Sequence, residues 1–218
     1  VGNARIIPMS NQAGQSNLRK RLLDAGLTVE KGDPALSRIL ERIKAREDEG
    51  YSYDTAQGSF ELLARDELGQ LPDLFEVKRY KVTVERRKNK YNKMVSLSEA
   101  VVVVKVDGEK RLSVSESMDE TGSDRGPVNA LAKALIKDLG RYSSVLEDMH
   151  LVDFKVRITQ GGTEAVTRVI IDSEDSKGRR WSTVGVSPNI IDASFEALLD
   201  AIRWKLIHDD QIEAMTGV

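Results

Sequence analysis

The spacing of apolar residues changes from a helical to a strand-like period near residue 70. Before that point, one stripe follows the i, i+3, i+4 and i+7 positions of a helix face: Leu36, Ile39, Leu40 and Ile43. After it, the apolar residues at 80, 82 and 84 alternate with polar ones, as in a half-buried strand. The segment between them contains Pro72, which favours a break. We therefore expect a helical segment over 1–70 and a strand-rich domain over 71–218.

Three helices are expected within this N-terminal segment. Ser16 is placed to cap the first helix. Asp33 followed by Pro34 is a stronger start signal, because aspartate accepts a hydrogen bond at the N-cap and proline suits the first helical position. Asp54 and Gln57 form a capping-box-like pair, which predicts the start of the third helix there.

The rest of the chain predicts strands and helices that follow the same order twice. The first set has strands over 80–84, 100–106 and 110–114, with a polar connection over 86–93 and a tight turn at Asp107-Gly108. The second set has strands over 152–159, 166–172 and 180–185, with turns at 161–162 and 177–178. Each set ends in an apolar-periodic helix, which runs to Leu139 in the first and to Leu206 in the second.

The starts of these two helices are alike, which indicates an internal duplication. Gly126-Pro127 and Ser187-Pro188 are each followed by a branched apolar residue and then by an alanine. A repeat offset by roughly 65 residues is the simplest interpretation. We expect an α+β fold in which a helical N-terminal linker precedes two βββα units, 75–149 and 150–210, related by a pseudo-two-fold axis.

Two helix starts near one axis would place free backbone N–H groups around a shared concave site. Such donors suit the carboxylate of a small ligand better than bond-breaking chemistry. The branched residues beside each start would wall an aliphatic pocket, and a nearby aspartate would accept an ammonium group. The predicted effector-binding residues are Asp124, Gly126, Pro127, Val128, Asn129, Ala130, Gly185, Ser187, Asn189, Ile191 and Ala193. The alternative is that the same residues form ordinary helix-entry loops and helix–sheet core.

Composition argues against several kinds of chemistry. The 218 residues carry a net charge of −2, which favours neither nucleic acid nor a membrane surface as partner. The chain has no cysteine, hence no disulfide, thiolate metal site or cysteine nucleophile, which fits a cytoplasmic protein. His150 and His208 do not form an HxH or HExxH metal motif, so no metal site is expected. The longest apolar run, 100–104, is too short to span a bilayer.

A basic segment over 78–93 is the main argument for another function. Tyr80 and Tyr91 lie among its lysines and arginines, a composition that also occurs in proteins that bind single-stranded nucleic acid. No RNP-like, KH-like or OB-like motif accompanies it, and a solvated hairpin is the simpler interpretation. An RNA-binding protein and a stand-alone ligand-binding or dimerisation module are the alternative functions.

Several segments resemble one enzyme family. Residues 184–198, Val-Gly-Val-Ser-Pro-Asn-Ile-Ile-Asp-Ala-Ser-Phe-Glu-Ala-Leu, closely resemble the second half of the C-terminal regulatory domain of α-isopropylmalate and citramalate synthases. Residues 126–131 are similar to its first half. Residues 1–17 resemble the V-G-N … S-x-x-x-G-x-S-N segment that follows the catalytic barrel in that family, and residues 50–63 resemble its small helical subdomains. The Leu-Val-Asp-Phe-Lys-Val-Arg run at 151–157 is most similar to the longer citramalate synthases.

The resemblance implies that this chain is the non-catalytic part of a longer acyltransferase. The family's (β/α)₈ barrel condenses acetyl-CoA with a 2-oxo acid and holds a divalent metal through residues that include an HxH pair; no such pair occurs in this chain. We therefore expect no cofactor here, with acetyl-CoA and the metal in the barrel. The family's regulatory domain forms a homodimer and binds the branched-chain end product, isoleucine for citramalate synthases and leucine for α-isopropylmalate synthases.

The resemblance has one departure and one further implication. Relatives usually carry Gly-x-Gly before the Pro-Val pair, whereas this chain has Asp124-Arg125-Gly126, which adds a carboxylate near the expected effector carboxylate. The matching N-terminal segment implies that a few polar and small residues lie near the mouth of the barrel and help to close the active site. These residues are Asn11, Gly14, Ser16 and Asn17.

Overall fold

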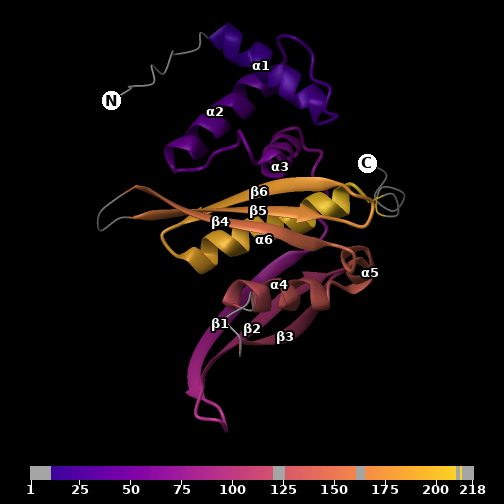
Figure 1. The fold of residues 1–218 in the computed structure, drawn as a ribbon. Helices are drawn as coiled ribbons and strands as arrows, with labels where there is room; N and C mark the ends of the chain where they lie inside the picture. Colours follow the sequence, from indigo (N-terminus) through magenta and orange to yellow (C-terminus); the bar gives the residue numbers. More distant parts are fainter. Residues whose placement is uncertain (1–10, 120–125, 161–164, 210–211, 213–218) are drawn as a thin grey trace.

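The computed structural model describes residues 11–119, 126–160, 165–209 and 212. Figure 1 shows four layers: the N-terminal helices, a sheet, a pair of helices and a second sheet. The helix pair lies between the sheets, so that each sheet has one face against a helix. This mixture of helices and antiparallel sheets confirms the α+β prediction.

The N-terminal layer consists of α1 (Asn11–Asp24), α2 (Pro34–Asp48) and α3 (Gln57–Glu67). Their apolar faces share a core that includes Leu22, Leu36, Ile39 and Phe60. The predicted start of α2 is confirmed, because the Asp33 carboxylate accepts a hydrogen bond of 2.8 Å from the backbone N–H of Ala35.

Two other predicted helix starts in this layer are wrong. Ser16 lies inside α1, which begins at Asn11. The N-cap of α3 is Ala56, whose side chain makes no capping hydrogen bond, and Asp54 lies outside the helix. Ala56 is fully buried and Phe60 almost so, which indicates that packing rather than a polar cap fixes where α3 begins.

Each sheet is three-stranded and antiparallel, with its strands in sequence order. The first contains β1 (Glu76–Lys88), β2 (Met94–Val106) and β3 (Glu109–Asp119), and α4 (Pro127–Lys137) follows it. The second contains β4 (His150–Gln160), β5 (Val166–Glu174) and β6 (Arg180–Ser187), and α6 (Ile190–Ile207) follows it. The short helices η1 (Gly140–Tyr142) and α5 (Ser143–Leu146) connect the two units.

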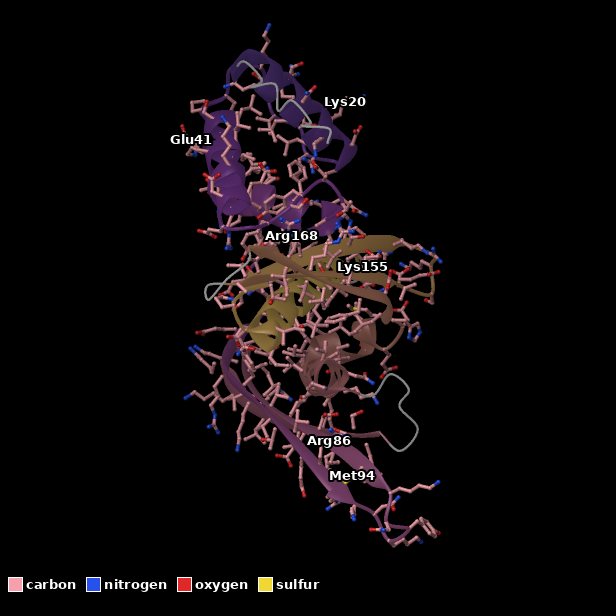
Figure 2. All side chains as sticks on the ribbon, turned by 60° about the vertical axis from the view of Figure 1, so that its left-hand side comes forward. Lys20, Glu41, Arg86, Met94, Lys155 and Arg168 are labelled. Carbon is pink, nitrogen blue, oxygen red and sulfur yellow. The ribbon has the colours of Figure 1, made fainter. Side chains whose placement is uncertain are left out.

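The first hairpin is longer than the alternation of apolar residues predicted. The pairing of β1 with β2 continues to Lys88 and Met94, so residues 86–88 of the expected connection belong to β1 and the connection shortens to 89–93. Arg86 and Met94 lie toward the tip of this projecting arm (Figure 2). Residues 83–88 of β1 are all exposed, so this part of the strand carries no burial signal that would reveal it in the sequence. The tight turn at Asp107-Gly108 is confirmed, with φ of +51° and +83°.

The α6 helix lies directly on the backbone of β6. The Trp181 indole donates a hydrogen bond of 3.1 Å to the carbonyl oxygen of Ala201, and the Thr183 hydroxyl donates one of 2.7 Å to that of Ala197. Gly185, the next residue on this face, has no side chain to keep the helix away. A Cβ added there would lie 2.0 Å from the carbonyl oxygen of Ala193.

The free edge of β6 is closed by side chains rather than by another strand. In the sheet order, β6 pairs only with β5, so alternate N–H groups point away from the sheet. The N–H of Val184 donates to the hydroxyl of Ser59 on α3 at 3.0 Å, and the N–H of Val186 donates to the carboxylate of Glu196 on α6 at 3.0 Å. The linker and α6 therefore meet along this edge.

The starts of α4 and α6 are similar, but their prolines occupy different positions relative to the N-cap. Pro127 is the first residue of α4 and Gly126 is its N-cap. Pro188 instead precedes the N-cap of α6, which is Asn189. The branched residues Val128 and Ile191 then occupy the same second helical position, so the duplication holds for the positions that face the core.

We expect Gly185→Ala to lower the free energy of unfolding by about 3 kcal/mol, the upper end of the usual cost of overpacking, because the added Cβ meets helix backbone that cannot rotate away. Urea denaturation followed by circular dichroism measures this change. Gly126→Ala is the matched control, since nothing lies within 4 Å of its added Cβ and its φ is −84°. Equal stability of the two variants would contradict this account of the α6–β6 contact.

Candidate functional site

The start of α4 has no side-chain cap. Gly126 is exposed, and its carbonyl accepts hydrogen bonds from the N–H groups of Asn129 and Ala130 at 3.1 and 3.2 Å. Gly126 has no side chain that could cap the helix, and Pro127 has no N–H group that would need a cap. The predicted Asp124 lies outside the described residues.

The start of α6 is capped by its own side chains. The Asn189 side chain accepts a hydrogen bond of 2.9 Å from the N–H of Ile191, and the Ser187 hydroxyl accepts one of 3.1 Å from the N–H of Asn189. Ile190 is exposed at this helix start, and Ile191 packs against the core. Two of the predicted effector residues, Ser187 and Asn189, thus already bind backbone groups.

The two helices lie side by side and begin on the same side of the helix layer, at left in Figure 1. Tyr80 on β1 joins the α6 start to the first sheet: its ring stacks on Phe195 with centroids 4.0 Å apart, and its hydroxyl donates to Asp192. Burial, followed by this hydrogen bond, raises the pKa of Tyr80. Sequence reasoning placed Tyr80 on a strand but did not assign it to the site.

Three predicted effector residues lie where helix packs on sheet. Ala130 and Ala193 are completely buried, and Gly185 is buried beneath Ala193 and Ala197. They lie beneath the two helix starts, and their small size lets the helix backbones lie close to the sheets. Binding of an effector by the predicted residues stays a prediction.

The residues expected near a barrel mouth lie on α1, in the outermost layer of Figure 1. Gly14 is buried, and a Cβ there would contact the side chain of Leu40 at 3.5 Å. Ser16 and Asn17 are exposed, and Asn11 begins the helix. Their proposed closeness to an active site stays a prediction.

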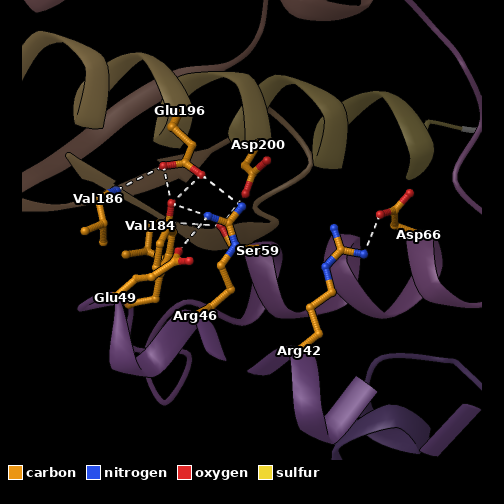
Figure 3. A network of polar contacts seen from close by, with 10 residues as sticks. Arg42, Arg46, Glu49, Ser59, Asp66, Val184, Val186, Glu196 and Asp200 are labelled. Atoms are coloured by element: carbon orange, nitrogen blue, oxygen red, sulfur yellow. Dashed lines mark hydrogen bonds and ion pairs between the residues drawn. The ribbon is translucent and has the colours of Figure 1, made fainter. Parts of the chain in front are cut away.

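A polar network joins the linker to α6, and the sequence analysis did not single it out. Figure 3 shows Glu196 and Asp200 pointing from α6 toward α2 and α3. The Tyr51 hydroxyl donates to the Glu196 carboxylate at 2.6 Å, and the Arg46 guanidinium lies 3.4 Å from the same carboxylate. Burial, followed by the hydrogen bond to Glu196, raises the pKa of Tyr51, which keeps its hydroxyl a donor.

The contacts continue along α6 at a spacing of four residues. Asp200 accepts a hydrogen bond of 2.7 Å from the Ser59 hydroxyl. The Trp204 indole donates to Glu61 at 2.8 Å, and Nε2 of His208 lies 2.9 Å from the same carboxylate. Although burial opposes ionisation, His208 and Arg65 lower the pKa of Glu61. Residues four apart lie on one helix face, so one face of α6 contacts the linker.

A cavity of about 420 Å³ lies within this junction. It is lined by α2, α3, the 71–75 segment, β6 and α6. Its lining includes Arg42 and Arg46, whose guanidinium groups pair with Asp66 and Glu196, and also Asp200 and Arg203. The cavity therefore combines charged groups with the apolar side chains that cover the linker–sheet boundary.

Within the described residues, no cluster of three histidine or acidic side chains is placed to hold a metal ion. In the same part of the chain, no helix has the length and apolar content needed to cross a membrane.

Comparison with known proteins assigns the fold to a family. The family described as LeuA allosteric (dimerisation) domain matches residues 54–206. The chain belongs to this family. The matched range begins just before α3, so it includes the helix that supplies Ser59 to the edge of β6. The resemblance stated from the residues alone is thereby confirmed.

Relatives in this family include named enzymes. The chain is 39% identical to an (R)-citramalate synthase of Aquifex aeolicus over 213 residues, which cover 97% of this chain and 38% of that protein. It is 39% identical to an (R)-citramalate synthase of Geobacter sulfurreducens, over 98% of this chain and 39% of the relative. A probable 2-isopropylmalate synthase of Methanopyrus kandleri is 27% identical, over 93% of this chain and 37% of the relative. The chain spans well under half the length of these relatives.

Asp200 makes the linker junction sensitive to pH. Burial raises the pKa of this carboxyl from 3.8 to about 6, and nearby Glu196 adds to the rise. A carboxyl with a raised folded-state pKa destabilises the protein above that pKa, and the penalty disappears as the pH falls from about 6 to about 4.

We therefore expect Asp200→Asn to stabilise the protein at pH 7.5, by up to about 3 kcal/mol, since each pKa unit corresponds to about 1.4 kcal/mol. The advantage should vanish near pH 4, where the wild-type carboxyl is neutral. Asparagine keeps an oxygen that accepts the Ser59 hydrogen bond. Thermal unfolding at both pH values measures the difference, and parallel pH profiles for the two proteins would contradict the assignment.

Proposed function

We propose that this chain is the regulatory region of an enzyme that condenses acetyl-CoA with a 2-oxo acid, as citramalate synthases do, and that it binds isoleucine as a feedback inhibitor. The observation that carries the proposal is the family match over 54–206, which includes both βββα units and both helix starts. The catalytic barrel, with its divalent metal, acetyl-CoA site and proposed contacts to α1, would lie outside this chain in a cytoplasmic enzyme.

The helix starts supply the recognition chemistry. The first turn of α4, which has no side-chain cap, would hold the effector carboxylate through the N–H of Val128 and the positive end of the helix dipole. Val128 and Ile191 would wall its aliphatic side chain, above a floor made by Ala130, Ala193 and Gly185. Isoleucine is proposed over leucine because the relatives named citramalate synthases reach 39% identity, whereas the Methanopyrus 2-isopropylmalate synthase reaches 27%.

A second copy of the chain is the proposed partner, and β4 is the proposed contact. Leu151, Phe154, Val156 and Ile158 of β4 are 38, 39, 41 and 71% exposed. Phe154 and Val156 pair in register with Ile171 and Val169, which α6 covers completely. These four residues of β4 therefore lie on the same face of the sheet as the β5 residues that α6 covers. Over β4 this face is not covered by any helix of the described residues. As β4 is also an edge strand, a partner can cover the face and pair with the edge.

The proposed signal travels through α6. Its first turn carries Ile191, which would contact the aliphatic side chain of the effector. The following turns bind the linker through Glu196, Asp200 and Trp204. A ligand that favours one position of the α6 start would favour one position of the linker, because a packed helix moves largely as a unit. The linker would carry that bias to the barrel.

Calorimetric titration with isoleucine, leucine and valine tests the effector site. We expect saturable binding that is tightest for isoleucine, and a loss of at least tenfold in Val128→Glu. The new carboxylate repels the effector carboxylate, yet an acidic residue in a first helical turn does not harm the helix. Ser37→Glu, in the exposed first turn of α2, is the control that should bind like wild type. Leucine as the tightest ligand would point to an isopropylmalate synthase instead.

Sedimentation of charged variants tests the dimer surface. We expect Phe154→Lys to weaken dimerisation at least tenfold, because a buried ammonium group would replace an aromatic contact. Leu112→Lys is the matched control, since Leu112 is 58% exposed on the outer face of β3. Dissociation of the control alone would move the interface from β4 to β3.

A further inference from the structure

The cavity between the linker and α6 contains two opposite charges that have no ion-pair partner within the described residues. Most charged groups around it are paired, with Arg42 bound to Asp66 and Glu67 and Arg46 bound to Glu49 and Glu196. Asp200 and Arg203 are the exceptions on α6. They lie three residues apart, so they project from neighbouring positions of one helix face into the same cavity.

Arg203 is held in place but not neutralised. Among the described residues, its guanidinium makes no hydrogen bond or ion pair, and its recorded neighbour is the Phe75 ring, whose centroid is 5.8 Å away. A ring at this distance orients an arginine without using its N–H donors. All five N–H donors of the guanidinium thus stay available for an anion. A carboxylate matches their geometry, because its two oxygens can accept two parallel hydrogen bonds.

Asp200 is the complementary group. One of its oxygens accepts the Ser59 hydroxyl at 2.7 Å, and within the described residues no cation lies at ion-pair distance. Arg203 and Arg46 act on it electrostatically, but burial prevails and raises the pKa of Asp200 to about 6. A part-buried carboxylate without a direct ion pair is costly, and a bound ammonium group would lower that cost.

The remaining walls are apolar. They include Leu62, Leu71, Leu74, Phe75 and Leu199, which belong to the core beneath the linker or pack against it. The volume of about 420 Å³ lies in the range of small-molecule sites. Asp73 stands exposed at the rim of the cavity, and its carboxylate would add attraction for a cation that enters.

We propose that this cavity binds a free α-amino acid with an aliphatic side chain, its carboxylate on Arg203, its ammonium group on Asp200 and its side chain against the apolar walls. A zwitterion satisfies both unpaired charges at once, which neither a simple anion nor a simple cation does. The site shares no residue with the proposed effector site at the helix starts. It adds a second amino-acid site to the proposed function and can be tested separately from it.

Occupancy of this cavity would tie α6 to the linker. The ligand would touch α6 through Asp200 and Arg203 and the linker side through Leu62 and the 71–75 segment. It would therefore strengthen the same junction that the Glu196 and Ser59 hydrogen bonds already hold. An amino acid bound here would stiffen the path between the helix starts and the N-terminal helices.

The test is calorimetric titration of the 218-residue chain with isoleucine and leucine, in wild type and in the Val128→Glu background that disables the helix-start site. We expect Val128→Glu to retain one binding event, which Arg203→Gln or Asp200→Asn then weakens at least tenfold. Arg38→Gln, an exposed arginine on α2 outside the cavity, is the control that should leave binding unchanged. Thermal unfolding of each variant verifies folding, and Arg203→Lys, which keeps the charge, should retain part of the affinity.

Two probes separate the charges. We expect 3-methylbutanoate, which lacks the ammonium group, and 3-methylbutylamine, which lacks the carboxylate, each to bind at least tenfold more weakly than leucine to the Val128→Glu variant. Near pH 6 the binding heat should depend on the ionisation enthalpy of the buffer, because an ammonium group displaces the proton of Asp200.

The outcomes distinguish the two sites. Loss of all binding in Val128→Glu, with unchanged binding in Arg203→Gln and Asp200→Asn, overturns the cavity site and leaves the proposed effector site standing. Binding that depends on Arg203 and Asp200 but not on Val128 supports the cavity site and overturns the site at the helix starts. No binding of either amino acid to the wild-type chain at millimolar concentration overturns both.

Discussion

The close approach of α6 to β6 is the constraint from which the arrangement of the other elements follows. Gly185 allows the helix backbone at Ala193 to lie where any side chain would clash. With the helix at this depth, Trp181 and Thr183 reach its carbonyl groups, and Glu196 reaches past the sheet edge to the N–H of Val186. The helix therefore covers one face of the sheet and helps to close its edge, which a helix held farther away could not do.

The same constraint explains why the linker packs where it does. An edge strand with unpaired N–H groups needs a partner, and α3 supplies one through the Ser59 hydroxyl. Once α3 lies along that edge, it meets the side of α6 that extends beyond the sheet. The contacts of Asp200, Trp204 and His208 then follow from the four-residue spacing of the helix. Helix α3 of the linker thus packs on α6 and β6 of the second unit, which makes the two units unequal despite their similar order of strands and helix.

Much of the fold follows from local sequence signals. The change of period near residue 70, the Asp33-Pro34 cap and the Asp107-Gly108 turn reflect interactions within a few residues, and the structure confirms them. The failures have a different cause. Ser16 and Asp54 have the right chemistry for caps, but Ser16 lies inside α1, and packing decides where α3 begins. Residues 83–88 of β1 are all exposed, so the far end of this strand has no alternation of buried and exposed positions for the sequence to reveal.

The candidate sites divide in the same way. The helix starts are visible in sequence because glycine, proline and asparagine mark them locally. The junction on α6 is not, because Glu196 and Asp200 have the spacing of an ordinary solvent-facing helix side, and only the fold brings Tyr51 and Ser59 to them across some 140 positions of the chain. This difference bears on regulation. In the proposed regulation, the first turn of α6 would recognise a ligand, and the next turns hold the linker through few, partly buried polar contacts. Such a helix would convert a small shift at one end into a change at the other. An apolar junction of the same area would be stronger, but it would respond less to a ligand or to a change of pH. It would contain no charged group whose pairing a ligand or a proton could change.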